Sequence, residues 1–375
     1  FKKFYKMIFC KICLMPSSRP RITFDKNKVC NGCKTFSSRK KTNWKQRKKE
    51  FFFLLNKFKK INKNKKYDCI LAFSGGKDSS AIALKLKFKF GLNPLLVTFN
   101  QLIPTKEGTQ NIKNILKLGF DHIYVEPDKR VSRSLAKDFF IKYGNPKLHW
   151  HSGVGAAPIQ VALEKKIPLV FYAENGEAEY GGRVLSKKHL IYKDSDEIYK
   201  NNLSGINPKS WINKKYNQKD IEPYIYPGKK ILNKSGIKSV YFAYFFPWDG
   251  EKNLEYVNKF FKFKTAKSGR NPGAFAGING VDDGIEDLYY YMQFIKFGFG
   301  RAFKDACRMI QRKQLSKLDA IKLIRKYDGE QSKNFPQAAR YMFLNMKQLK
   351  KTIDKFRNSK YWKKTNNKWQ LKYKL

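Results

Sequence analysis

The chain has 375 residues, and its 79 Lys and Arg residues against 30 Asp and Glu residues give a formal net charge of +49 at pH 7. This length can hold one large domain or two, with a sizeable core. No run of about 18 uncharged apolar residues occurs, which excludes a conventional transmembrane helix.

The excess of positive charge has two interpretations. One is a nucleic acid or another polyanion as partner. The other is codon bias, because Lys, Asn, Ile, Phe and Tyr, which all have AT-rich codons, are abundant together and the lysines are scattered. We favour codon bias for most of the charge, and we do not expect nucleic acid as the partner. Lys11 interrupts a signal-like N-terminus and no small-residue cleavage site follows, so we expect a cytoplasmic protein.

Four of the six cysteines form two pairs near the N-terminus, Cys10-x-x-Cys13 and Cys30-x-x-Cys33. Two such pairs suit a tetrahedral zinc site with four thiolates. Disulfides and a redox pair are the alternatives, but a cytoplasmic setting and two matched pairs favour zinc. We therefore predict that residues 1–40 form a lobe stabilised by structural zinc.

A basic segment follows at 41–66 and contains the apolar patch FFFLLNKFKKI at 51–61. This pattern is typical of an amphipathic helix. A helix lying on a membrane surface would have a similar pattern. We expect instead that the helix connects the zinc lobe to the next domain and packs against that domain.

From residue 67 onward, apolar runs alternate with helical patterns. The expected strands lie at 67–73, 95–100, 121–126 and 168–172. The expected helices lie at 79–90, 107–118, 132–143 and 156–166. This alternation predicts an α/β domain over 67–250, with a parallel sheet and helices on both faces. Ligands are then expected beyond the carboxyl ends of the strands.

The remainder of the chain is irregular at first and then helical. One more strand is expected at 239–246, before the Gly- and Asn-rich stretch 268–284. The last helices are expected at 285–299, 301–312, 315–327 and 336–358. We interpret 251–375 as a mainly helical region that covers one end of the sheet.

The first expected strand breaks into a glycine turn, SGGKDSS at 74–80, which leads into a helix. Glycines permit positive φ and close backbone approach, and a helix start offers free N–H groups, so the turn is shaped for phosphate. It lacks both the spacing of a Walker A loop and the G-x-G-x-x-G of a dinucleotide site. Its S-G-G-x-D-S string resembles the pyrophosphate loop of the ATP pyrophosphatases, which cleave ATP between the α and β phosphates.

This resemblance implies a role for each residue of the turn. Asp78 would hold Mg²⁺ and Lys77 would add charge near the phosphates, and we predict that both are catalytic. The residues that would cradle the leaving pyrophosphate are Ser74, Gly75, Gly76, Ser79 and Ser80.

Two other loops are expected at the same edge of the sheet. Segment 174–182 carries three carboxylates, which indicate a metal or an amine near the phosphate site, although a solvated acidic loop is the alternative. We predict catalytic roles for Glu177 and Glu179. Segment 149–155 places two histidines beside a Gly turn and is interpreted as a ligand-contact loop, with helix capping as the alternative. The nucleotide contacts predicted outside the glycine turn are Phe99, Gly153 and Asn175.

The two remaining cysteines bear on which nucleophile is used. ATP pyrophosphatases that transfer sulfur to tRNA generally carry further catalytic cysteines. Cys69 lies within an expected core strand and Cys307 in a basic helix, far apart in sequence. Nitrogen transfer is therefore preferred.

Several motifs outside the turn resemble one family, the N-acetyl sugar amidotransferases, over about 7–330. They are C-x-x-C-x-M-P-x-x-R-P-x-I-T-F-D at 10–25, the second C-x-x-C, E-N-G at 174–176, E-Y-G-G at 179–182, P-W-D at 247–249 and K-F-G-F-G-R at 296–301. The family belongs to the ATP pyrophosphatases and acts in surface-polysaccharide or flagellin sugar biosynthesis.

The resemblance implies an activity with ATP, Mg²⁺ and structural Zn²⁺. The acetamido oxygen of a nucleotide-activated N-acetyl sugar would be adenylated, and ammonia would then displace AMP to give an acetamidino group. No glutaminase motif is present, so the resemblance also implies a separate glutaminase subunit, of the type paired with imidazole glycerol phosphate synthase, as the source of ammonia. A tRNA-modifying thiolase or lysidine-type ligase is the first alternative, and a non-enzymatic nucleotide-binding scaffold is the second.

Overall fold

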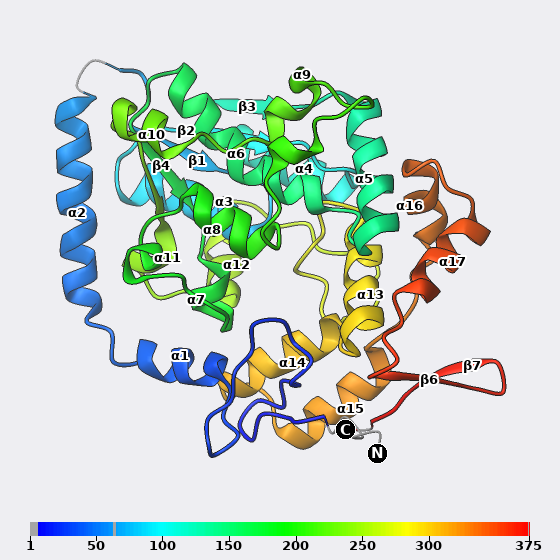
Figure 1. The fold of residues 1–375 in the computed structure, drawn as a ribbon. Coiled ribbons are helices and arrows are strands. Elements are labelled where there is room, and N and C mark those ends of the chain that lie inside the picture. The colour runs from blue at the N-terminus through cyan, green and yellow to red at the C-terminus, as the bar shows by residue number, and fades with distance from the viewer. Residues whose placement is uncertain (1–6, 63–64, 374) are drawn as a thin grey trace.

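The computed structural model describes residues 7–62, 65–373 and 375, and its centre is a five-stranded sheet (Figure 1). All neighbouring strands are parallel, in the order β3-β2-β1-β4-β5. The strands are β1 (Cys69–Ala72), β2 (Pro94–Phe99), β3 (His122–Val125), β4 (Leu169–Tyr172) and β5 (Lys238–Tyr241). Every residue of β2 and β4 is buried, as expected for parallel strands covered on both faces. The predicted α/β fold is confirmed.

Alternate residues of β1 point into two separate hydrophobic cores. Ile70 belongs to the core that also contains residues of α5 (Lys129–Tyr143) and α6 (Leu148–Glu164). Cys69 and Leu71 belong to the core on the opposite face. That second core is covered by α2 (Trp44–Ile61), α3 (Lys77–Leu84), α4 (Lys106–Leu116) and α12 (Gly250–Asn258). The amphipathic helix predicted at 51–61 thus packs on the sheet, as part of α2.

Helix α6 begins earlier than expected, at Leu148 rather than near residue 156. The glycines of 153–155 suggested a turn, but most of α6 is buried between β2 and the irregular region, and this burial outweighs the low helix propensity of glycine. His149, His151 and Gly153 therefore lie inside a helix, so the loop conformation predicted for 149–155 is wrong, and the predicted ligand contact of this segment stays a prediction.

Three other boundaries differ from the prediction. The helix expected at 79–90 comprises α3 and a π-helix, Lys85–Lys89. The strand expected at 239–246 ends at Tyr241, where the chain turns into α11 (Phe242–Phe245). The first and last residues of α11 are three apart, and the helical turn places both of them in the core beside α2.

The helix expected at 336–358 is two helices, α16 (Phe335–Tyr341) and α17 (Met346–Lys355). Phe343 between them has a φ of 53°, and Asn345 forms a capping box with Gln348. A hairpin that the sequence pattern did not predict follows, formed by β6 (Trp362–Thr365) and β7 (Lys368–Leu371).

The irregular region between β4 and β5 consists of short helical pieces. They are α7 (Gly176–Tyr180), α8 (Ser195–Glu197), α9 (Gln218–Ile221), α10 (Lys229–Ser235), the π-helix Ile198–Asn202 and the 3-10 turns Lys187–Leu190, Pro208–Trp211 and Glu222–Tyr224. Several of their buried aromatic residues extend the core on the α6 side of the sheet.

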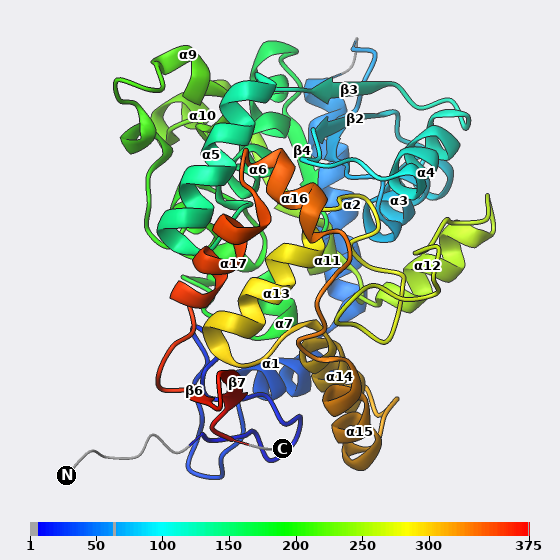
Figure 2. The same cartoon turned by 90° about the vertical axis from the view of Figure 1, so that its right-hand side faces the viewer.

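The N-terminal and C-terminal regions meet at one end of the molecule (Figure 1, Figure 2). The cysteine lobe, with α1 (Asn31–Arg39), shares a small core with α14 (Arg301–Gln311) and α15 (Lys317–Tyr327). Helix α13 (Glu286–Phe297) packs with α16, α17 and the hairpin in another core. Over the described residues, no helix is both long and apolar enough to cross a membrane.

Candidate functional site

The glycine turn lies where the strand order reverses, between the neighbouring strands β1 and β4. Crossovers leave this point in opposite directions, which opens a crevice at the carboxyl ends of the two strands. Gly75 has a φ of 81°, and a Cβ atom there would overlap the side chain of Ile112 on α4. Glycine is thus required at this position both by the backbone conformation and by the lack of space.

Hydrogen bonds within the turn hold it open toward the crevice. The Gly76 N–H donates to Ser74 Oγ at 3.2 Å, and Ser79 Oγ donates to the Gly76 carbonyl at 3.2 Å. Gly76 caps α3, and no side chain accepts from the first N–H groups of this helix. These donors, together with the positive end of the helix dipole, suit a phosphate group.

Lys77 and Asp78 are held by residues from distant segments. Lys77 Nζ donates to Asp78 Oδ2 at 2.6 Å and to Asn279 Oδ1 at 2.7 Å. Asp78 Oδ1 accepts from Asn253 Nδ2 of α12 at 2.9 Å. Sequence reasoning predicted the pair on the turn but missed both asparagines, because nothing in 253–279 resembles a nucleotide motif.

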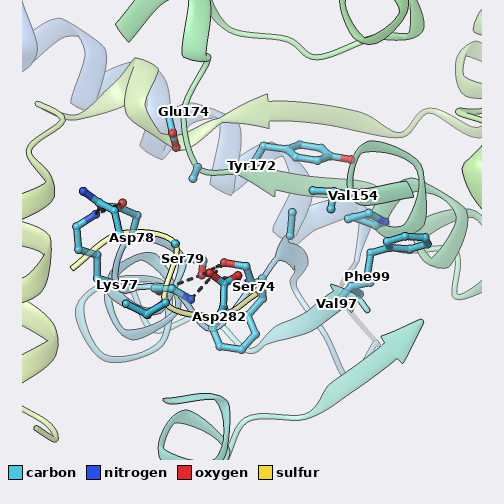
Figure 3. A pocket seen from close by; sticks show the side chains of 18 of the residues that line it. Ser74, Lys77, Asp78, Ser79, Val97, Phe99, Val154, Tyr172, Glu174 and Asp282 are labelled. Atoms are coloured by element: carbon cyan, nitrogen blue, oxygen red, sulfur yellow. Dashed lines mark hydrogen bonds and ion pairs between the residues drawn. The ribbon is translucent and has the colours of Figure 1, made fainter. Parts of the chain in front are cut away.

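A cavity of about 370 Å³ opens above the turn and has two chemically different ends (Figure 3). The polar end carries Ser74, Ser79, Lys77, Asp78, Glu174 and Asp282. The apolar end is formed by Val97, Phe99, Val154 and Tyr172. A nucleotide matches this division, because its base is flat and largely apolar and its phosphates are charged.

Of the three nucleotide contacts predicted outside the turn, Phe99 and Gly153 are placed differently. Phe99 lines the apolar end of the cavity, whereas Gly153 lies behind it, where a Cβ atom would overlap the Phe99 ring. Gly153 therefore fixes the position of the ring that faces the cavity. Lys193 also lines the cavity and lies near the rings of Tyr172 and Tyr241, and burial lowers its pKa. No motif in the sequence marks Lys193.

Glu174 is the acidic residue of the 174–182 loop that reaches the cavity. Burial and the neighbouring Asp78 carboxylate raise the pKa of Glu174 to about 7, and its Oε1 accepts from the Tyr180 hydroxyl at 3.2 Å. Two carboxylates near a phosphate-binding turn are the ligand type that Mg²⁺ prefers. Asp78 and Glu174 are the residues that would hold a magnesium ion at this end of the cavity.

Glu177 and Glu179 point away from this cavity and pair with arginines of the N-terminal region. Glu177 Oε1 lies 2.6 Å from Arg21 Nη2, and Glu179 forms an ion pair with Arg39. Both side chains are largely buried in these contacts. Their arrangement suits attachment of the loop to the lobe, and their predicted catalytic roles stay predictions.

Asn175 is buried at the start of this loop and does not line the cavity. Its Oδ1 caps α7 by accepting from the backbone of Glu177 and Ala178. Its Nδ2 donates to the His189 carbonyl and to Glu197 Oε1. The nucleotide contact predicted for Asn175 stays a prediction, and its observed bonds hold the loop in place.

The four N-terminal cysteines converge on one point. They are buried and reduced, and their sulfur atoms all lie within 4.8 Å of one another. Cys10 Sγ and Cys33 Sγ are 3.8 Å apart, and Cys13 Sγ and Cys30 Sγ are 3.7 Å apart. A tetrahedron with Zn–S bonds of about 2.3 Å has edges of about 3.8 Å, so the cluster fits zinc.

The cysteine lobe contacts the 174–182 loop directly. A Cβ atom on Gly181, which has a φ of 73°, would overlap the backbone of Gly32 between the second pair of cysteines. Asn31 Nδ2 also donates to the Gly182 carbonyl at 3.2 Å. A metal in the lobe would therefore stabilise the surface on which this loop rests.

One family comparison bears on this arrangement. Residues 239–375 match the family described as "LPS biosynthesis protein WbpG-like, C-terminal domain". The C-terminal region is WbpG-like. This region supplies Asn279 and Asp282 to the cavity above the glycine turn (below, the nucleotide cavity), and its Asn253 donates to Asp78. The match thus links a region similar to a lipopolysaccharide-biosynthesis domain to the glycine turn.

Two other proteins are similar to parts of the chain. An uncharacterized protein of Methanocaldococcus jannaschii is 41% identical over 110 residues, which are 29% of this chain and 38% of that relative's length. A solved structure described as a predicted subunit of a tRNA methyltransferase from the same organism aligns at 21% identity. It covers 45% of this chain and 74% of its own, and its TM-score of 0.23 is too low to establish a shared fold.

Proposed function

We propose that the protein is an ATP-dependent amidotransferase that converts the acetamido group of a nucleotide-activated N-acetyl sugar into an acetamidino group. One observation carries this proposal: the WbpG-like region completes the nucleotide cavity. Asn279 of that region binds Lys77 of the phosphate turn, and Asn253 binds Asp78. The phosphate chemistry and the polysaccharide-related region thus form a single site.

The proposed reaction explains why ATP is cleaved between its α and β phosphates. An amide oxygen is a poor leaving group, and its attack on the α phosphate converts it into an imidate that carries AMP while pyrophosphate leaves. Ammonia then adds to the imidate carbon, AMP departs with the former amide oxygen, and the amidine remains. The N–H groups at the start of α3 and the Lys77 ammonium stabilise the departing pyrophosphate.

Other residues orient the reactants. Phe99 and Tyr172 provide the apolar surface for the base, which places the α phosphate near Asp78. A magnesium ion held by Asp78 and Glu174 would supply charge neutralisation on the phosphates. Asp282, whose pKa burial raises to about 6, lies at the same polar end and is placed to hold a proton near the reacting groups.

Ammonia is proposed to come from a separate glutaminase subunit. The described residues contain no unpaired cysteine in the nucleotide cavity, because Cys69 is in the core and Cys307 is buried against the cysteine lobe. A nitrogen nucleophile delivered from a partner avoids protonation in bulk solvent.

The direct test is to incubate the zinc-loaded protein with Mg·ATP, ammonium chloride and a panel of N-acetylated nucleotide sugars. AMP and pyrophosphate should form in equal amounts only when a suitable sugar is present. The sugar's mass should change by the replacement of one oxygen with NH. AMP formation that requires tRNA and responds to no sugar would contradict the proposal and favour a tRNA-modifying enzyme.

A further inference from the structure

A second large cavity, of about 360 Å³, lies between the cysteine lobe, α7 and the helices α13 and α14. A smaller cavity of about 110 Å³ lies between this cavity and the glycine turn. It shares Lys77 and Asp78 with the nucleotide cavity, and Tyr180 and Arg308 with the second cavity. The second cavity is thus adjacent to the reacting end of the nucleotide site.

Four cations that line the second cavity form no ion pair within the part of the chain that the structure describes: Arg19, Lys296, Lys304 and Arg308. Lys296 Nζ donates instead to the Tyr143 carbonyl, whereas the other three are the cations considered below. Arg308 lies over the ring of Tyr180, with its guanidinium carbon 3.6 Å from the ring centre. Burial, opposed by the Glu177 carboxylate and assisted by Arg308, lowers the pKa of Arg19, and burial together with Arg308 and Arg19 lowers the pKa of Lys304 to about 7.

Two carboxylates near these cations are paired with other arginines. Glu177, which lines the cavity, binds Arg21 through both of its oxygens. Asp305 on α14 lies 3.5 Å from Arg301. The cavity therefore carries uncompensated positive charge, and unlike the scattered surface lysines this charge is gathered in one enclosed place.

Two amide groups that line the same cavity have unused hydrogen-bonding capacity. Asn201 is 6% exposed, and its Oδ1 has no hydrogen-bond partner. The Nε2 atom of Gln293 is also buried without a partner. Buried polar atoms are nearly always hydrogen-bonded, so a polar ligand that supplies a donor and an acceptor is expected there. Tyr289 and Phe297 add aromatic surface to the wall.

We propose that this cavity binds the nucleoside diphosphate part of the acceptor sugar, with the diphosphate on Arg19, Lys304 and Arg308. The identity of the sugar rests on the proposed function, whereas the location of its binding site is inferred from the side chains described above. More than one cation without a partner matches a ligand with more than one negative charge. The sugar then extends through the smaller cavity toward Asp78, which brings its acetamido group to the α phosphate of ATP.

Arg19 and Lys304 are suited to a test because they line the second cavity and neither of the other two. Binding of UDP, GDP and dTDP to the zinc-loaded protein is measured by calorimetry in the presence of saturating α,β-methylene-ATP, which occupies the nucleotide cavity and is not cleaved. At least one nucleoside diphosphate should bind, and N-acetylglucosamine alone should bind far more weakly.

Arg19→Ala and Lys304→Ala should each weaken this binding roughly 10- to 100-fold, because each removes a charge-assisted contact. Lys304→Arg should retain most of the affinity, since it keeps the charge. Lys347→Ala, on the exposed surface of α17, is the matched control and should have no effect. All variants should bind α,β-methylene-ATP as the parent protein does.

Failure of every nucleoside diphosphate to bind would overturn the inference. So would a loss of α,β-methylene-ATP binding in the Arg19 and Lys304 variants, because the cations would then serve the pyrophosphate of ATP. Neither binding measurement requires turnover. The binding site can therefore be confirmed even if the proposed amidotransferase reaction is not observed, and the reaction can be confirmed even if this binding site is wrong.

Discussion

The nucleotide cavity and the second cavity are similar in volume, about 370 and 360 Å³, but they differ in how their charges are balanced. In the nucleotide cavity Lys77 is paired with Asp78 and neutral amides complete the network. In the second cavity Arg19, Lys304 and Arg308 form no ion pair with any described residue. We expect the ion pair of the nucleotide cavity to rearrange around a reacting phosphate. We expect the cations without ion pairs in the second cavity to bind an anion.

The two cavities also differ in how the chain builds them. The phosphate end of the first comes mostly from one strand–turn–helix unit. Local hydrogen bonds fix the turn itself, while Asn253 and Asn279 hold Asp78 and Lys77. The second cavity gathers residues from the cysteine lobe, α7, α13 and α14. Its geometry should therefore depend on the lobe, and that of the nucleotide cavity should not.

The largest effect is expected from Asp78→Asn, which tests the first cavity. The change removes the charge that pairs with Lys77 and would hold magnesium, and AMP formation should fall roughly 100- to 1,000-fold. Measured by the same AMP assay, the control Glu177→Gln should cost much less, because Glu177 lies outside this cavity and binds Arg21. Equal losses in the two variants would mean that Glu177 takes part in the chemistry.

Loss of the metal site in the cysteine lobe tests whether the second cavity depends on the lobe while the nucleotide cavity does not. Cys13→Ser should abolish stoichiometric zinc and displace Arg19, which lies on the same lobe, so that nucleoside diphosphate binding weakens about 100-fold or more. Binding of α,β-methylene-ATP should persist, because the sheet has its own two cores. Calorimetry and metal analysis measure both, with Cys69→Ala as the control that keeps zinc. Loss of both ligands together would contradict the independence of the cavities.

A smaller effect is expected from a substitution in α6, at its contact with the nucleotide cavity. Gly153→Ala would force the Phe99 ring toward the nucleotide, so the KM for ATP should rise about tenfold and stability should fall by about 1–3 kcal/mol. Gly228→Ala is the control, because its φ is −68° and a Cβ atom there meets open space. An unchanged KM would show that Phe99 does not contact the base.

The smallest predicted effect is the pH dependence of nucleotide-sugar binding. Lys304 has a pKa of about 7 in the free protein, and a bound diphosphate raises it, so binding takes up a proton. Affinity should therefore be highest below pH 7 and decline about three- to tenfold as the pH rises from 6 to 8. The diphosphate diester of the sugar keeps its charge over this range. Lys304→Arg should give a flat profile, and a profile unchanged by that substitution would exclude Lys304 as its source.

The sequence predicts those parts of the site whose residues are close together in the chain. Residues 74–80 are contiguous, so their identities predict both the turn and its phosphate chemistry, and the four cysteines likewise predict their cluster by spacing. Asn253 and Asn279 reach Lys77 and Asp78 only through tertiary packing, and no local pattern marks them.

Burial explains the remaining differences between prediction and structure. The glycines of α6 indicated a turn, but one of them is required by the close approach of Phe99 within a buried helix. The acidic loop was predicted to face the phosphate site, and the structure directs Glu174 there while Glu177 and Glu179 bind arginines. The partners of a side chain, which lie far away in sequence, decide its direction.

The measurement that tests the central claim most directly follows the acetamido oxygen. An N-acetylated nucleotide sugar that turns over is prepared with ¹⁸O in its acetamido group and is incubated with Mg·ATP and ammonia. If the protein adenylates that oxygen, the AMP released carries one ¹⁸O atom and the pyrophosphate carries none. Unlabelled AMP formed together with an amidine product would contradict the account, because the oxygen would then have left by a route that does not pass through the α phosphate.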